Sequence, residues 1–210
     1  MIFPIRLARA LGSVAVPLAI AAFAVPAAAA TDSADLAQVQ AHLTGVQSMT
    51  ANFVQTDAKR RSSAGTLQLK RPGRIRFQYG SGDLLLIANG EKLNFVDYQV
   101  GQKSSWALNK TPLGILLAAN PNIKGSATIV PSGDPRTVVV RAKGRNNPGY
   151  GTLILAFLRS PSAPAGLLLY GWTAIDAQNK RTTVKLSNQR YNVAVPDGAF
   201  TFAEPKKRGR

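Results

Sequence analysis

The chain has 210 residues and no cysteine, and its 26 lysines and arginines outnumber its 10 acidic residues, for a formal net charge of +16. This length supports one good hydrophobic core and leaves little room for two full domains. The 45% hydrophobic content excludes a disordered basic protein, and the lack of cysteine excludes disulfides, thiolate metal sites and thiol catalysis. The basic excess indicates an anionic partner: nucleic acid, membrane head groups or acidic protein.

Residues 1–30 have the layout of a secretory signal peptide. Arg6 and Arg9 precede an apolar run over residues 11–25, and an Ala-Ala-Ala cleavage pattern ends at Ala30. A membrane anchor is the rival interpretation, but glycine and proline interrupt the run and alanine replaces the expected leucine. Cleavage near Ala30 would export the chain to the periplasm or the cell exterior, where nucleic acid is not its partner.

The segment after this leader is predicted to be a helix. Its apolar residues recur at three- and four-residue spacing, which is typical of one helical face. These residues are Leu36, Val39, Leu43 and Val46. Asp32 or Ser33 is expected to cap the helix, which is expected to end near Ser48.

Farther along the chain, apolar and polar residues alternate in short runs, and this pattern predicts β-strands. The predicted strands are 67–70, 74–79, 83–88, 93–95, 123–130, 137–142, 152–158, 166–175 and 182–189. Their even spacing and short turns predict a mostly β fold with some α, built on one antiparallel sheet of about ten or eleven strands.

One apolar segment, 111–120, interrupts the strands. Thr111 is a suitable helix N-cap, Pro112 suits the first turn, and Asn120-Pro121 ends the helix. Because this helix is apolar almost all round, it is predicted either to pack in the core or to cover a hydrophobic cavity.

The sequence contains no motif for catalysis. Its single histidine, His42, is predicted to be structural or solvated, and there is no nucleophile elbow, phosphate-binding glycine loop or histidine-based metal spacing. The acidic residues are dispersed beside turns, and the basic ones along strand edges, turns and a tail. We therefore expect a protein that is not an enzyme and has no catalytic residue, cofactor or metal.

Several blocks of sequence have the order and spacing of a known family. They are MTANFVQ (49–55), GTLQLKRPGRIRF (65–77), NGEKL (89–93), Asp97, Gln102, Thr111-Pro112-Leu113 and the closing segment 181–202. Together they resemble the LolA family of periplasmic lipoprotein carriers over nearly all of the chain after the leader. The resemblance divides the chain into a signal peptide (1–30), a carrier domain (31–203) and a basic tail (204–210).

The resemblance implies a strongly curved antiparallel sheet, like half a barrel, closed by a helical lid over a hydrophobic cavity. The implied lid residues are Leu36, Val39, Leu43, Val46, Leu113, Leu116 and Leu117. The implied acyl-chain cavity residues are Leu67, Leu69, Ile75, Phe77, Leu93 and Phe95. Gln68, Asn94 and Val96 stand where large aromatic residues are expected, so the cavity lining is predicted to differ.

The resemblance also implies that Arg71 is a lid latch. Its guanidinium would donate hydrogen bonds to lid-helix backbone near Leu43 and around Leu117-Ala118. The alternative is an arginine that fixes the end of a strand.

The implied function is that of a periplasmic chaperone. It would take triacylated lipoproteins from an inner-membrane Lol ABC transporter and deliver them to an outer-membrane, LolB-like receptor. LolB is itself a lipoprotein that needs a cysteine, and this chain has none. The alternative is a LolA-fold regulatory protein that senses lipid or lipoprotein. We expect a monomer that does not bind nucleic acid and that contacts anionic membrane surfaces weakly.

Overall fold

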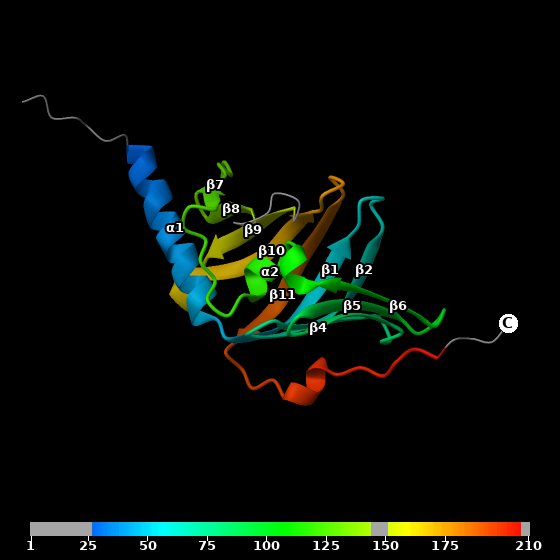
Figure 1. The fold of residues 1–210 in the computed structure, drawn as a ribbon. Coiled ribbons are helices and arrows are strands. Elements are labelled where there is room, and N and C mark those ends of the chain that lie inside the picture. Colours follow the sequence, from blue (N-terminus) through cyan, green and yellow to red (C-terminus); the bar gives the residue numbers. More distant parts are fainter. Residues whose placement is uncertain (1–26, 144–150, 207–210) are drawn as a thin grey trace, which may run out of the picture.

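An antiparallel sheet of eleven strands forms most of the molecule (Figure 1). The computed structural model describes residues 27–143 and 151–206, and of residues 27–30 only the backbone. The strand order is β6-β5-β4-β3-β2-β1-β11-β10-β9-β8-β7. Two meanders, β1–β6 and β7–β11, therefore join where β1 pairs with β11. The predicted mostly β fold with one large antiparallel sheet is confirmed.

The elements have the following bounds. The strands are β1 (Ser48–Thr56), β2 (Ser62–Lys70), β3 (Arg74–Tyr79), β4 (Leu84–Asn89), β5 (Lys92–Asp97), β6 (Gln102–Ala107), β7 (Ala127–Ile129), β8 (Thr137–Lys143), β9 (Thr152–Arg159), β10 (Leu167–Ile175) and β11 (Arg181–Tyr191). The helices are α1 (Ala27–Gly45) and α2 (Leu113–Leu117), with 3₁₀ turns η1 (Leu108–Lys110), η3 (Pro164–Gly166) and η4 (Asp197–Phe200).

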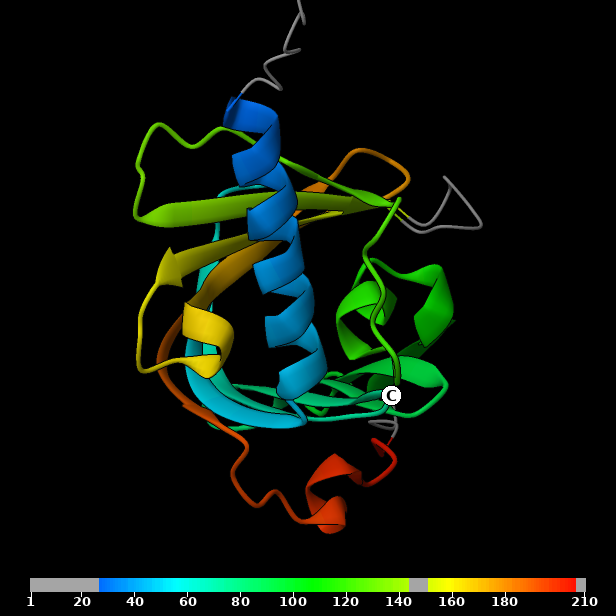
Figure 2. The same ribbon diagram turned by 90° about the vertical axis from the view of Figure 1, so that its left-hand side faces the viewer.

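The sheet is strongly curved and wraps around the two α-helices (Figure 2). Alternation along each strand decides which side chains face inward. In β3, for example, Ile75, Phe77 and Tyr79 are buried on the concave side, whereas Arg74 and Arg76 point outward and are only partly buried. A sheet with one apolar and one wet face buries the apolar face against another layer. Here α1 and α2 supply that layer.

The helices begin and end at different residues from those predicted. Within the described residues α1 covers Ala27–Gly45, so that Asp32 and Ser33 lie inside it and do not cap it, and it ends at Gly45, shortly before β1 starts at Ser48. α2 is restricted to Leu113–Leu117, and Pro112 is its N-cap. The Thr111 side chain instead donates to Leu108 O (2.8 Å), which closes η1. Proline supplies the fixed φ that starts α2 without a side-chain cap.

One further strand prediction needs correction, and the predictions for the two chain ends fall largely outside the described residues. The predicted strand 123–130 is reduced to β7, because Lys124 and Gly125 form a turn. The signal-peptide prediction falls mostly on residues 1–26, which lie outside the described residues, as does the end of the basic tail (207–210). Within the described part of the chain, no helix is long and apolar enough to cross a membrane.

The segment after β11 lies on the outer side of the first meander (Figures 1 and 2). Asp197 forms ion pairs with Lys70 and Arg74, both at 2.6 Å. Farther along, Phe202 packs against a small cluster of buried residues on β4 and β5, made up of Leu85, Ile87 and Val96. This C-terminal segment therefore covers the outer face of the first half of the sheet.

Candidate functional site: an apolar concave face with a helical cover

The concave face of the sheet forms one continuous apolar cluster with the helices. Its aromatic centre is Phe53 on β1, whose ring lies 5.0 Å from that of Phe77 and 5.1 Å from that of Tyr79, in edge-to-face geometry. The ring of Trp172 on β10 meets Phe77 at 6.0 Å. Both halves of the sheet thus contribute to a single core, and each edge-to-face pair adds to the free energy gained from burial.

We call α1 and α2 the helical cover. The buried apolar residues of α1 are Val39 and Leu43, and Val46, predicted to lie on the same helical face, follows just after the helix ends. Those of α2 are Leu113, Leu116 and Leu117, and Leu36 packs against the same cluster. α1 has further polar contacts with the second half of the sheet. For example, Arg159 on β9 pairs with Asp35 at 2.7 Å. α2 has no side-chain cap and spans only five residues, too few to be stable as an isolated helix.

Arg71, at the turn between β2 and β3, joins the two helices. Its Nε donates to Val46 O just beyond the end of α1 (2.8 Å), and its Nη1 donates to Ala118 O at the end of α2 (2.9 Å). The residue is only 6% exposed, and burial lowers the pKa of its guanidinium to about 10, so it stays charged at neutral pH. The planar fork of donors allows one side chain to reach two backbone segments at once.

Backbone bonds from the same turn strengthen this connection. Arg71 N–H donates to Gln47 O (2.8 Å) between α1 and β1, and Gly73 N–H donates to Leu117 O (2.9 Å) in α2. Gly73 has φ +69°, and a Cβ there would come within 2.6 Å of Gly90 O. Only glycine fits this close approach, which fixes the turn against α2.

The connection between α1 and β1 is held from a second direction by Asn192, the first residue after β11. Its Oδ1 accepts from Gln47 N–H (2.8 Å) and its Nδ2 donates to Gly45 O (3.1 Å). Its own N–H donates to Ser48 O (2.8 Å). Asn192 thus binds Gly45 O, one of the carbonyls that the end of α1 leaves without a helical partner, and Arg71 binds the next two carbonyls along the chain, Val46 O and Gln47 O.

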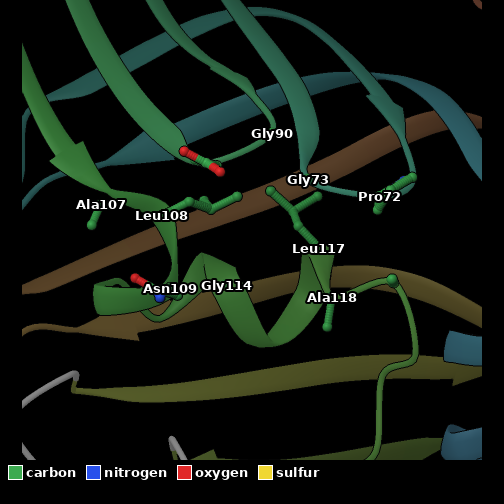
Figure 3. Close-up of a pocket in the computed structure, with 11 residues that line it drawn as sticks. Pro72, Gly73, Gly90, Ala107, Leu108, Asn109, Gly114, Leu117 and Ala118 are labelled. Atoms are coloured by element: carbon green, nitrogen blue, oxygen red, sulfur yellow. The ribbon is translucent and has the colours of Figure 1, made fainter.

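A pocket of about 500 Å³ lies beside this connection, between the sheet and α2. Figure 3 shows the turns at Gly73 and Gly90 on one side of the pocket and α2 with Leu117 on the other. Ala118, whose carbonyl accepts from Arg71, also lines it. The packing between α2 and the sheet is therefore incomplete at the end where Arg71 holds the helix.

The comparison with family models shows to which family this chain belongs. Residues 44–203 match the model described as "Outer membrane lipoprotein carrier protein LolA". The chain belongs to the LolA family. This match covers the whole sheet, α2 and most of the C-terminal segment.

Two sequence relatives that are named as lipoprotein carriers agree with that assignment. An outer-membrane lipoprotein carrier protein of Chromobacterium violaceum is 28% identical over 90% of this chain and 93% of its own length. One from Legionella pneumophila (strain Corby) is 29% identical over 80% and 85%. Among solved structures, a LolA superfamily protein from Nitrosomonas europaea is 14% identical, with a TM-score of 0.44 and coverage of 81% of this chain and 97% of that one. The LolA family is a carrier family and not an enzyme family, in agreement with the sequence prediction.

The structure places the residues that the resemblance nominated as follows. The cavity candidates Leu67, Leu69, Ile75, Phe77 and Leu93 are buried on the concave face, in the same cluster as the nominated residues of the helical cover. Phe95 shares the concave side of β5 but is only partly buried. The predicted effect of Gln68, Asn94 and Val96 on the cavity lining is wrong, because all three lie on the outer face.

Sequence reasoning missed half of the concave face. The missed side chains include Met49, Phe53, Leu153, Leu155, Phe157, Leu169 and Trp172. The signal was present in β9, whose residues alternate as Leu153, Leu155 and Phe157, but no motif connected that strand with the cavity. Asn192 was also missed, because its partners lie 145 and 147 residues away in the sequence.

His42 lies inside this core. It is 2% exposed, its Nδ1–H donates to Pro164 O (3.0 Å), and its ring meets those of Phe157 and Tyr191 edge-on at 5.1 and 5.5 Å. Burial lowers its pKa, with a smaller contribution from the charge of Arg71, so the ring is neutral at pH 7. Its role is structural. In the described ranges no group of three or more histidine or acidic side chains could hold a metal ion.

Proposed function

We propose that this protein is a periplasmic chaperone that binds the acyl chains of lipoproteins released from the inner membrane and carries them to the outer membrane. The family assignment and the named relatives support this function. The single observation that carries it is Arg71, which holds α1 and α2 together over an otherwise apolar concave face. A rigid core would not need a buried charge at that place, whereas a cover that opens and closes needs a reversible contact.

In this proposal, acyl chains replace the side chains of the helical cover on the concave face. Burial of an acyl chain is worth about 0.8 kcal/mol per methylene. Three fully buried chains would therefore be released too slowly for a carrier. The empty, closed state has its own packing and its own hydrogen bonds from Arg71, and these must be given up when cargo binds. Closure therefore offsets part of the binding free energy and permits delivery.

The route of entry follows from the weakest part of the cover. α2 is short and uncapped, and the pocket beside Gly73 and Gly90 already separates part of it from the sheet. We propose that α2 moves away from the sheet at this point and exposes Leu69 and Phe77 to the acyl chains. The proposed partners are triacylated lipoproteins, an inner-membrane Lol ABC transporter and a LolB-like outer-membrane receptor, with the carrier acting as a monomer.

Photo-crosslinking in the presence of a triacylated lipoprotein tests the binding site. A photoreactive residue placed at Leu69 or Phe77, on the concave face, is expected to crosslink to the acyl chains. Matched controls at Gln68 and Gln78 lie on the same strands but on the outer face, and are expected to give no crosslink. Equal crosslinking from both faces, or none from either, would reject the cavity.

Release of lipoprotein from spheroplasts tests the carrier role. Addition of the purified protein is expected to release mature lipoprotein into the medium as a soluble complex. The alternative function is a LolA-fold periplasmic protein that senses lipid or lipoprotein and regulates a membrane partner. Failure to release lipoprotein, together with a stable complex with a signalling protein, would favour that alternative.

A further inference from the structure

The outer face of the sheet is divided into two unlike halves. On the first meander, the C-terminal segment covers the apolar residues, and its acidic residues neutralise the cations beneath it. Asp197 pairs with Lys70 and Arg74, and Glu204 pairs with Lys103. In Figures 1 and 2 this segment follows β3–β5 and does not reach the outer side of β8–β11.

The outer face of β8–β11 carries apolar side chains that are only partly buried. The pairing registers place them next to one another: Ile154 is opposite Arg141 and Thr173, and Leu158 is opposite Leu168. Tyr170, at an irregularity in β10, is 40% exposed. Three partly buried aliphatic side chains and one exposed tyrosine thus lie on adjacent strands that the described C-terminal segment does not cover, and apolar groups gathered in this way point to a binding partner.

Unpaired cations surround these apolar side chains. Arg141, Lys143, Arg181 and Lys185 are all exposed on the same four strands, and β8–β11 contain no aspartate or glutamate. Within the described residues, none of the four takes part in an ion pair. We call this surface, made of the four cations with Ile154, Leu158, Leu168 and Tyr170, the outer platform.

We propose that the outer platform docks the carrier onto anionic lipid surfaces. Anionic head groups complement the four unpaired cations, and the partly buried aliphatic side chains and the exposed Tyr170 suit the boundary between head groups and acyl chains. A second copy of the chain would present the same cations and be repelled. A lipid surface also needs no matched shape, so the spread of the four cations over four strands suits it.

The docking face is on the opposite side of the sheet from the helical cover. A carrier bound through the outer platform therefore keeps α1 and α2 turned away from the lipid, so that docking and cargo exchange use separate surfaces. Docking needs no cargo, and its test is independent of the proposed carrier function: docking can fail while lipoprotein release from spheroplasts succeeds, and the reverse.

Binding to vesicles tests the proposal. The processed chain, purified from the periplasm without cargo, is expected to bind vesicles that contain phosphatidylglycerol and not vesicles of phosphatidylcholine alone, and added salt should weaken the binding. Each surface cation is worth roughly fivefold in affinity. Arg141→Gln with Lys185→Gln is therefore expected to lower the affinity about 25-fold.

A matched control removes the same charge elsewhere. Lys92 and Lys110 are exposed and lie outside the platform, so Lys92→Gln with Lys110→Gln should change the affinity less than about twofold if binding is local. Equal losses in the two double variants would overturn the proposal, because they would indicate a general charge effect. Absence of binding to phosphatidylglycerol vesicles at low salt would also overturn it.

A fluorescent label can report which face meets the lipid. Because the chain has no cysteine, a single Tyr170→Cys or Val100→Cys variant can be labelled at one site with an environment-sensitive dye. Val100 is 56% exposed in the turn between β5 and β6. The dye at position 170 is expected to brighten with anionic vesicles and the dye at 100 to stay unchanged. The reverse pattern, or equal brightening with soluble polyglutamate, would reject lipid docking by this face.

Discussion

Replacement of Arg71 by leucine is expected to shift the helical cover toward its open state and to slow delivery of cargo. The variant loses two charge-assisted hydrogen bonds, to Val46 O and Ala118 O, each worth about 1.5–3 kcal/mol. Burial of the guanidinium opposes them. It lowers the pKa of Arg71 to about 10, which at about 1.4 kcal/mol per pKa unit corresponds to a cost of about 3 kcal/mol. The net preference of Arg71 for the closed state is thus up to about 3 kcal/mol, and we expect a value near the middle of the range, about 1.5 kcal/mol or roughly tenfold.

This range corresponds to an increase of up to about a hundredfold in the ratio of open to closed molecules. Loading is expected to persist, because the concave face is unchanged. Delivery is expected to slow, because closure then contributes less to the expulsion of the acyl chains. Hydrogen exchange of the amides in α2, measured without cargo, should become faster by the same factor. Transfer of a labelled lipoprotein to receptor-containing vesicles should become slower.

Arg76→Leu is the matched control. Arg76 Nη1 donates to Ala199 O (3.3 Å) and Thr201 O (3.1 Å) on the outer face, so this arginine also binds two carbonyls but does not touch the cover. Its replacement should leave α2 exchange and cargo delivery unchanged. If Arg71→Leu exchanges and delivers at the wild-type rate, or if Arg76→Leu has the same effect, the reasoning is refuted.

Three further substitutions probe the surroundings of the site. Asn192→Asp keeps the acceptor for Gln47 N–H but removes the donor to Gly45 O. The free energy of unfolding in urea should therefore fall by about 1 kcal/mol. An unchanged urea midpoint would show that Asn192 does not stabilise the connection between α1 and β1. The buried His42 has a lowered pKa, so the unfolded chain binds its proton more readily. The free energy of unfolding should therefore fall as the pH drops below about 6.5, by at most about 1.4 kcal/mol per pH unit; a His42→Gln variant with the same dependence would rule out this source. Phe77→Ala should lower the free energy of unfolding by about 3–5 kcal/mol in the same urea assay. A decrease below about 1 kcal/mol would mean that the concave face is loosely packed.

The sequence predicted the parts of the fold that depend on local patterns. Alternation in β3 identified a strand and showed that Ile75 and Phe77 share one face, and the 3-4 spacing around Leu43 identified α1. The boundaries were less accurate where a distant contact decides them. α2 ends at Leu117, and not at Asn120, because Gly73 N–H takes the carbonyl of Leu117, and nothing within 111–120 encodes that partner.

The residues of the candidate site were likewise predicted where a local motif marks them and missed where only a distant contact defines their role. Arg71 was nominated because it stands in the Lys-Arg-Pro block on which the resemblance rested, and the structure places its hydrogen bonds at the two helix ends. Asn192 stands in no such block, and its role depends on the end of β11 meeting the start of β1. The face occupied by Gln68 and Asn94 was misjudged because alternation identifies two faces without saying which is concave. Only the pairing of whole strands decides that.

The helical cover depends on contacts outside the helices. α2 has five residues and no side-chain cap, and a helix of this length is not stable on its own. Its two last acceptors, Leu117 O and Ala118 O, are bound by Gly73 N–H and Arg71 Nη1 from the turn between β2 and β3. Loss of these bonds would therefore destabilise the helical conformation of α2 and also detach it from the turn between β2 and β3. Under the proposed function, we expect the segment from η1 to β7 to open as one unit that unwinds at α2. One buried arginine would then be sufficient to control the opening, because a five-residue helix contributes little stability of its own.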